Sequence, residues 1–200
     1  MISIDALDAS EREPPTARQA QVLDALEALF LAEGFRTVTV EELARRLRCS
    51  RRTLYLLAPT KEEIFMRVLD RFLARLRRKG WEGAKAAATP DAAIGHYLLP
   101  AIEAASKISA TMIGDLDAHP PAKDIWVRHS RERMEGLRSL VDECVRQEIF
   151  RGVDSYLVAE VLWAGLRRVL EPEFLAASGL SLGEAVAELY ALFLDGLLRS

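Results

Sequence analysis

Five arginines lie within the eight residues from Arg45 to Arg52, around a single cysteine and a single serine. A guanidinium group donates hydrogen bonds from a planar fork that matches the oxygens of a phosphate, so such a cluster is a candidate site for a polyanion. The alternative is a solvated surface that only keeps the protein in solution.

The basic charge is concentrated in one segment of an otherwise acidic chain. The whole sequence has 27 Lys and Arg against 30 Asp and Glu, a formal net charge of −3. Residues 41–80 contain twelve basic and five acidic residues, a net charge of +7, whereas residues 81–200 contain twelve and eighteen, a net charge of −6. This asymmetry predicts a polyanionic partner for the segment 41–80 alone.

Short helices are predicted to position these arginines. Ser50 has the side chain of an N-cap for a helix over residues 51–57, and Pro59 stops that helix, because the residue before a proline is pushed out of the α region. The helix before it begins at Thr39, which has the spacing of a capping box, and runs to about Arg48. Two short helices joined by so tight a turn are typical of a helix-turn-helix unit.

Helical spacing of apolar residues recurs over the rest of the chain. One helix is predicted between Thr16 and Gly34, and a longer one opens at Thr60. The Gly- and Ala-rich stretch 80–91 is expected to separate the longer helix from the remaining bundle, and Pro100 to kink or end the next helix. We therefore predict an all-α protein of about nine helices.

Several motifs around the cluster stand in one order and spacing: Phe30, Gly34, TVTVEELA (37–44), Ser50, TLY (53–55) and KEE (61–63). This pattern resembles the DNA-binding domain of the TetR family of bacterial transcriptional regulators. The resemblance implies a three-helix helix-turn-helix DNA-binding domain over residues 14–60. It also implies a helical bundle for effector binding and dimerisation over residues 61–200.

Geometry and the resemblance together assign the side chains that contact DNA. Arg51 and Arg52 are expected to enter the major groove, where an arginine bonds two acceptors of guanine. The other side chains are expected to contact phosphates or to orient the helix. The predicted set is Thr39, Arg48, Ser50, Arg51, Arg52, Thr53, Tyr55 and Lys61.

The chain departs from the family pattern at four positions. Leu47 and Arg48 replace a small residue and a glycine in the turn, Arg52 stands where glycine is frequent, and Ala58 replaces an aromatic residue. The added arginines are compatible with DNA binding. The smaller Ala58 raises the alternative that operator reading is lost and the protein acts as an interaction partner of another regulator.

The last two predicted helices have more apolar surface than one packing stripe requires. A two-fold four-helix bundle with a second copy would cover it, as in the resembling family, and would present two recognition helices to a near-palindromic operator. The alternative is that one chain covers both faces. The predicted interface residues are Leu162, Leu166, Leu189, Phe193 and Leu197.

The resemblance also implies a small-molecule pocket in the C-terminal bundle, whose ligand releases a repressor from DNA. Aromatic residues and methionines are the candidates for its lining, although residues of these types at helical spacing also build ordinary cores. The candidates are Phe72, Tyr97, Met112, Trp126, Met134 and Trp163.

Other classes of protein find little support. We find no metal-ligand spacing, no cofactor motif and no catalytic constellation, and therefore expect neither metal nor cofactor nor enzymatic activity. No apolar run reaches the length of about 18 residues that a membrane span needs. The resulting expectation is a cytoplasmic, homodimeric repressor that binds double-stranded DNA and a small-molecule effector.

Overall fold

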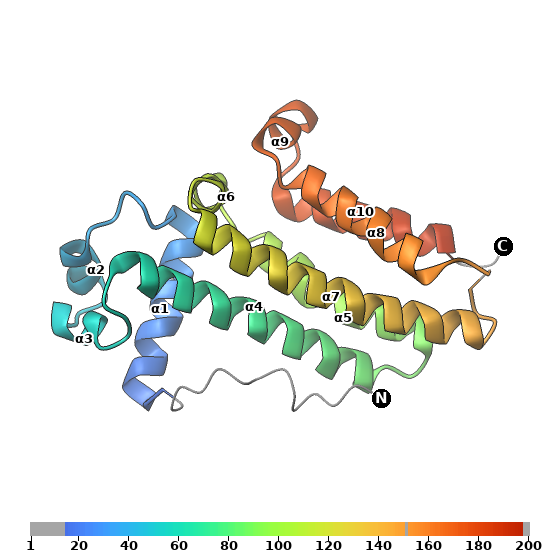
Figure 1. Cartoon of the computed structure of the whole chain (residues 1–200), viewed down its shortest axis with the longest axis horizontal. Helices are drawn as coiled ribbons and strands as arrows, with labels where there is room; N and C mark the ends of the chain where they lie inside the picture. Colours follow the sequence, from blue (N-terminus) through green and yellow to red (C-terminus); the bar gives the residue numbers. More distant parts are fainter. Residues whose placement is uncertain (1–14, 151, 198–200) are drawn as a thin grey trace.

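The structure is a computed structural model that describes residues 15–150 and 152–197 (Figure 1). This part of the chain contains ten α-helices and no β-strand, so the predicted all-α fold is confirmed. The helices are α1 (Ala17–Glu33), α2 (Val40–Arg46), α3 (Arg51–Tyr55), α4 (Lys61–Ala86), α5 (Pro90–Ala105), α6 (Ala110–Asp117), α7 (Pro120–Arg146), α8 (Ser155–Val169), α9 (Pro172–Ser178) and α10 (Leu182–Leu197).

Hydrogen-bonded caps start the first four helices where the sequence predicts them. The side-chain oxygens of Thr16, Thr39, Ser50 and Thr60 each accept a bond from the backbone N–H three residues further on, at 3.3, 3.2, 3.1 and 3.1 Å. Helix α1 ends at Gly34, whose φ of 77° lies in the left-handed region that glycine adopts without strain. Local side-chain chemistry therefore accounts for the order of α1 to α4.

Aromatic packing joins the first three helices to the start of α4. The ring of Phe35 stacks on that of Phe65 with centroids 3.9 Å apart, and Phe30 meets Phe65 edge-on at 5.5 Å. Leu43 of α2 and Leu54 of α3 are fully buried in the same core. Since α4 contributes to this core and to the second one, the domain boundary at residue 60 remains a prediction.

The expected break at residues 80–91 is wrong, because α4 continues through both glycines to Ala86. A Cβ at Gly80 would lie 2.8 Å from the carbonyl oxygen of Tyr97, and one at Gly83 would lie 2.9 Å from that of His96. The glycines therefore serve close packing of α4 against α5. The sequence alone cannot distinguish this role from helix termination.

Two further expectations about helices are refined. Pro100 was expected to kink or end its helix, and it lies inside α5 without ending it. The carbonyl that Pro100 cannot bond belongs to His96 and faces Gly83 of α4, where no side chain intervenes. Helix α9 was not among the nine predicted helices, although Pro172 at its first turn and Gly179 just beyond it, with φ 70°, are ordinary helix boundaries.

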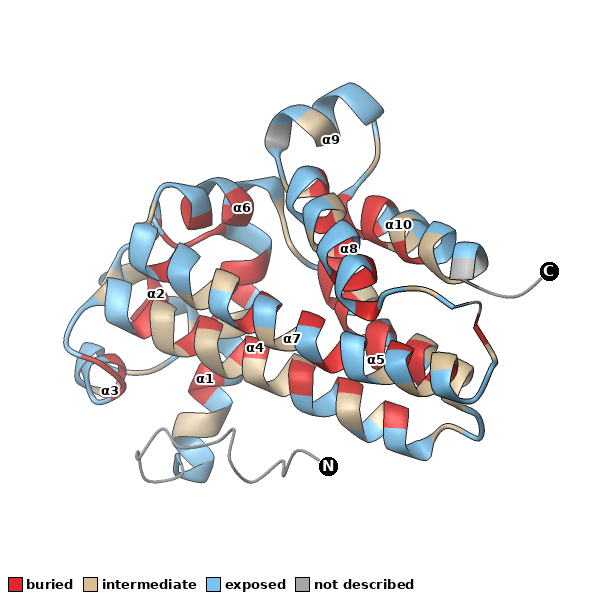
Figure 2. Cartoon of the chain, turned by 45° about the vertical axis from the view of Figure 1, so that its right-hand side comes forward, coloured by how far each residue is buried: buried red, intermediate tan, exposed pale blue. Residues whose placement is uncertain are grey.

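The second core lies among α4, α5, α7, α8 and α10. Helices α4, α5 and α7 run side by side along the molecule, and α8 with α10 packs on the end away from α1 to α3 (Figure 1). Figure 2 shows the buried residues gathered on the facing sides of these helices, with α9 standing clear of the bundle. The helix-turn-helix unit and the α8–α10 pair therefore occupy opposite ends.

Helix α6 connects the two cores through a buried carboxylate. Asp115 accepts hydrogen bonds from the backbone N–H groups of Phe35 and Arg36, at 2.7 and 2.9 Å. The N–H of Ser109 donates to the carbonyl of Leu31 at 2.9 Å. The end of α1 is thereby bonded to a helix that lies about 80 residues further along the chain.

Candidate functional site

A turn of four residues, 47–50, places α3 at the outer end of the molecule. The N–H of Cys49 donates to the carbonyl of Ala44 at 3.0 Å, which bonds the turn to α2. Arg48 adopts a φ of 49°, in the left-handed region. The turn therefore has the backbone conformation that glycine adopts most easily, although arginine occupies this position.

The arginine cluster is divided by its carboxylate partners. Three of its members form ion pairs: Arg45 with Glu42 at 2.6 Å, Arg46 with Glu33 at 2.5 Å, and Arg51 with Glu41 at 2.7 Å. The hydrogen bond from Arg46 lowers the pKa of Glu33, and the one from Arg45 lowers the pKa of Glu42. These three arginines therefore already neutralise charges of the protein itself.

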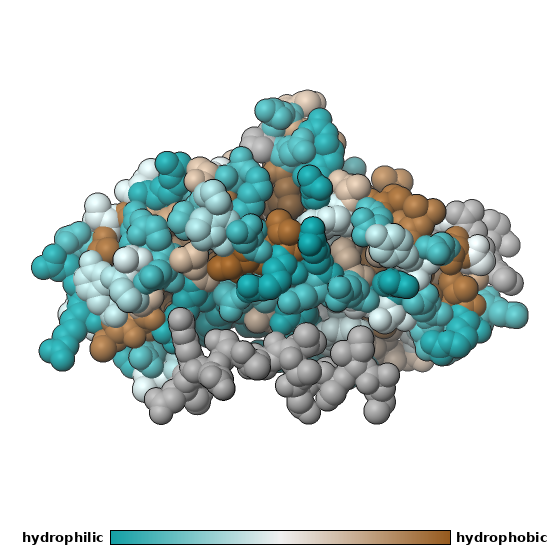
Figure 3. Space-filling view, in the orientation of Figure 1, coloured by the Kyte–Doolittle hydropathy of each residue, from teal (hydrophilic) through white to brown (hydrophobic). Residues whose placement is uncertain are grey.

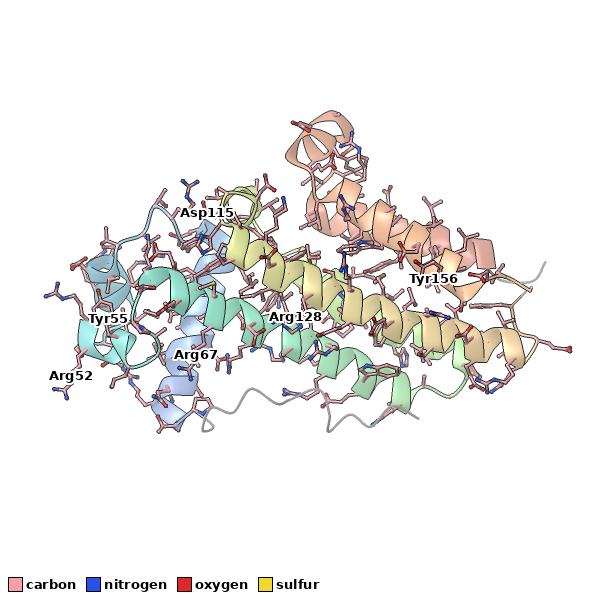
Figure 4. The ribbon with its side chains drawn as sticks, viewed as in Figure 1. Arg52, Tyr55, Arg67, Asp115, Arg128 and Tyr156 are labelled. Atoms are coloured by element: carbon pink, nitrogen blue, oxygen red, sulfur yellow. The ribbon has the colours of Figure 1, made fainter. Side chains whose placement is uncertain are left out.

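The other two arginines, Arg48 and Arg52, are exposed and available to an external anion. Among the described residues, neither guanidinium group has a hydrogen-bond or ion-pair partner. Figure 4 shows Arg52 extending away from α3 at the end of the molecule. Figure 3 shows mostly hydrophilic side chains over this end.

The remaining predicted residues of α3 divide between orientation and contact. The hydroxyl of Ser50 accepts the N–H of Thr53 at 3.1 Å and lies 2.9 Å from the hydroxyl of Thr53. Tyr55 is 48% exposed, so its hydroxyl can reach a phosphate. Ser50 therefore orients α3, while Arg52 and Tyr55 form its free surface (Figure 4).

Thr39 and Lys61 are engaged in the frame around α2. The hydroxyl of Thr39 accepts the N–H of Glu42. The Nζ of Lys61 donates to the carbonyls of Arg36 and Val38, at 2.9 and 3.1 Å. Lys61 thus holds the loop before α2 against the start of α4, and one of its three donor positions remains for a phosphate.

Solved structures of transcriptional regulators share this arrangement over nearly the whole chain. The ketosteroid transcriptional regulator KstR2 of Mycobacterium tuberculosis is 17% identical, with 94% of this chain and 98% of that chain covered and a TM-score of 0.59. PfmR of Thermus thermophilus is 23% identical, with 89% of this chain and 99% of that chain covered and a TM-score of 0.63. The fatty acid degradation regulator FadR of Bacillus halodurans is 15% identical, with 94% of this chain and 100% of that chain covered and a TM-score of 0.69. At these identities the likeness shows the fold. No curated protein sequence matches the chain.

The helix-turn-helix segment itself also matches a family by sequence. Residues 22–68 match the family described as bacterial regulatory proteins of the tetR family. The helix-turn-helix segment of this chain is therefore of the tetR type. The match covers α2, α3 and the ends of α1 and α4 that pack on them, so the predicted recognition helix lies within it.

The two predicted interface residues of α8 do not lie on its exposed face. Leu162 is completely buried and Leu166 is 8% exposed, and both pack inside the protein's own core. Val161 is instead 57% exposed. Leu189 and Phe193 of α10 are partly buried against the same core, and the side chain of Leu197 lies outside the described residues.

The predicted pocket residues do not come together around one cavity. The principal cavity lies among α4, α5, α7, α8 and α10, and Trp126 alone of the six predicted residues lines it. The other five lie in the packed cores around it or between them: Phe72, Tyr97, Met112, Met134 and Trp163. Aromatic residues and methionine are as common in packed cores as in ligand pockets, so the sequence could not distinguish core residues from pocket residues.

The cavity instead involves three polar residues that the sequence prediction missed: His129, Ser130 and Arg133. They follow Trp126 on α7 at positions three, four and seven residues further on, a spacing that places them on one side of the helix. That spacing was the available signal. Within residues 15–150 and 152–197, no helix is long and apolar enough to cross a membrane, and no cluster of metal-ligating side chains occurs.

Proposed function

We propose that this TetR-family regulator is a homodimeric repressor that reads a near-palindromic operator through α3. The observation that carries the proposal is the free and exposed pair Arg48 and Arg52 on a capped helix-turn-helix, in the segment with a net charge of +7. Phosphate neutralisation by such residues supplies affinity, and an arginine at a guanine edge supplies sequence preference. The cytoplasm is where such a protein meets DNA.

A homodimer is supported by unpartnered apolar surface. On α8, Leu157 and Val161 are 61% and 57% exposed, and on α10, Leu192 is 75% exposed. These residues belong to two adjacent, contacting helices at the end opposite α3. A second copy of the same helix pair would cover both stripes and would place two recognition helices on one DNA duplex.

Effector release completes the proposal. The cavity among the C-terminal helices is the site for a small molecule, and α6 links this bundle to the end of α1 through Asp115. A ligand that binds more tightly to the dimer conformation with one spacing of the two recognition helices shifts the population toward that conformation.

The test measures binding of the full-length protein to DNA from upstream of its own gene, by fluorescence anisotropy at several salt concentrations. Arg52→Ala should weaken specific binding about 10-fold or more, because it removes a base contact. Arg131→Ala is the matched control, since Arg131 is an exposed arginine of α7, far from α3, and should change little.

The contrary result is binding without sequence preference that is insensitive to Arg52→Ala. It would favour the alternative, in which operator reading is lost and the protein pairs with another regulator.

A further inference from the structure

One side of the principal cavity is a row of hydrogen-bond donors. Trp126, Ser130 and Arg133 occupy successive turns of α7 and line the cavity together. The opposite walls come from α4, α5, α8 and α10 and are largely aliphatic, with Leu73, Leu170 and Val186 among them. The cavity itself has a volume of about 50 Å³ and lies in a hollow of about 510 Å³ that includes space open to solvent.

Within the described part of the chain, Trp126 and Ser130 have no acceptor and Arg133 has no carboxylate partner. The indole Nε1 of Trp126 is buried without a hydrogen-bond partner. The hydroxyl of Ser130 forms no hydrogen bond with a described residue. The guanidinium of Arg133 interacts with Tyr97, whose ring centroid is 6.0 Å away, and forms no ion pair with a described residue. Buried donors are nearly always paired in proteins, so this row fits a ligand that supplies acceptors.

The nearby carboxylates are already committed to other cations. Asp70 pairs with Arg128 at 2.7 Å and with Nε2 of His129 at 2.9 Å. Glu132 pairs with the buried Arg77. Among the described residues, no Asp or Glu side chain lines the cavity. Arg133 therefore gives the cavity a positive charge that no lining residue of the protein neutralises.

We propose that the cavity binds an amphipathic monocarboxylate with an unbranched alkyl chain of medium length. The carboxylate accepts from the guanidinium fork of Arg133, from the hydroxyl of Ser130 and from the indole N–H of Trp126. The alkyl chain lies against the aliphatic walls, where its burial removes apolar surface from water. This inference rests on the proposed function, since it names the chemical class of the effector.

The test is isothermal titration calorimetry of the full-length protein with octanoate, octan-1-ol and octylamine, which share chain length and differ in the head group. Octanoate is expected to bind at least 10-fold more tightly than octan-1-ol, and octylamine more weakly still. Arg133→Gln should weaken octanoate binding at least 10-fold and leave octan-1-ol unchanged. Arg131→Gln, an exposed position on the same helix, is the matched control and should bind octanoate like the wild type.

Two binding patterns would overturn the ligand class. One is octylamine binding as tightly as octanoate, and the other is octanoate binding that Arg133→Gln leaves unchanged. Thermal unfolding followed by circular dichroism confirms that each variant is folded. Absence of octanoate binding to the folded wild type also overturns the proposal.

Adding octanoate to the protein–DNA complex separates this inference from the proposed function. Octanoate binding with release of DNA supports both. Octanoate binding in the cavity without release, or without any specific DNA binding, upholds the ligand class and counts against the repressor mechanism. Specific DNA binding by a protein that does not bind octanoate upholds DNA recognition and rejects the ligand class.

Discussion

Arg48 is held in a backbone conformation that disfavours any residue with a Cβ. Its φ of 49° lies in the left-handed region, where the Cβ crowds the neighbouring carbonyl oxygen. A glycine would adopt the same turn without that strain. Glycine has no guanidinium group, whereas that of Arg48 is exposed and has no partner among the described residues. This difference fits a phosphate contact by Arg48 beside α3.

Replacing Arg48 with glycine is expected to increase the free energy of unfolding by up to about 1 kcal/mol, because relief of strain exceeds the entropy gained by the unfolded chain. Urea unfolding followed by circular dichroism measures it. Arg131→Gly, within α7, is the control and should lower the free energy of unfolding by about 1 kcal/mol. A loss of stability in Arg48→Gly as large as in the control would show that the turn needs the arginine.

At the scale of elements, Asp115 is the bond between α6 and the end of α1. Its carboxylate accepts two backbone N–H groups that have no helical partner, those of Phe35 and Arg36. The carboxylate also packs directly on Gly34, where a Cβ would overlap it. The close approach of α6 to this loop therefore depends on a glycine and a carboxylate together.

The substitution Asp115→Ala should lower the free energy of unfolding by about 2 to 4 kcal/mol, because it leaves one buried and one partly buried N–H group without an acceptor. Asp117→Ala is the matched control on the same helix, where an exposed carboxylate pairs with Lys123, and should change the free energy by less than about 1 kcal/mol. Chemical denaturation of both variants measures the difference. Equal effects would contradict the structural role given to Asp115.

Helices α4 and α7 are joined by an interaction that depends on pH. A hydrogen bond from His129 is the largest cause that lowers the pKa of Asp70, aided by the charges of His129 and Arg128 and opposed by burial. A carboxyl with a lowered folded-state pKa stabilises the fold above its unfolded pKa of 3.8 and loses that contribution as the pH falls through the folded value.

The difference in unfolding free energy between wild type and Asp70→Asn should therefore be greatest above about pH 4 and should shrink at lower pH. Urea unfolding of both proteins across this range tests it. Asp124→Asn, an exposed carboxyl on α7, serves as the control whose difference from wild type should stay nearly constant. A difference for Asp70→Asn that grows on acidification would contradict the expected sign.

At the scale of the whole molecule, the two ends have opposite surface character. Figure 3 shows apolar patches over the end that carries α8 and α10, while the end with α2 and α3 is mostly hydrophilic. Tyr156, labelled in Figure 4, is a further exposed apolar side chain of α8, 57% exposed. The proposed dimer buries the first end and leaves the second facing DNA.

The substitution Leu192→Glu should convert the dimer to a monomer, because it places a charge in an apolar interface, and should weaken operator binding at least 10-fold. Light scattering coupled to size-exclusion chromatography measures the mass. Leu56→Glu is the control for oligomeric state, since Leu56 is also strongly exposed, at 65%, but lies beside α3. A wild-type protein that is monomeric at micromolar concentration would rule out this dimer.

The sequence by itself determined the all-α class, the starts of the first four helices and the position of the recognition helix. Each of the first four helices starts at a side chain that accepts a hydrogen bond from a residue only three positions away, so its start can be predicted from local residue spacing. These capping residues are Thr16, Thr39, Ser50 and Thr60. The order of motifs around Ser50 likewise indicated the family that residues 22–68 match. The short helix α9 also had its boundary residues in the sequence, but seven residues are too few to establish a helical period.

Only the tertiary structure decided which side chains are free. The sequence shows five equivalent arginines, but Glu33 and Glu41 lie ten or more residues from the arginines they bind, which leaves Arg48 and Arg52 unpaired. In the same way, α8 is apolar on more than one face, so its rotation was not determined by periodicity. Packing against α7 and α10 buries Leu162 and exposes Val161, because contacts between distant segments select the buried face.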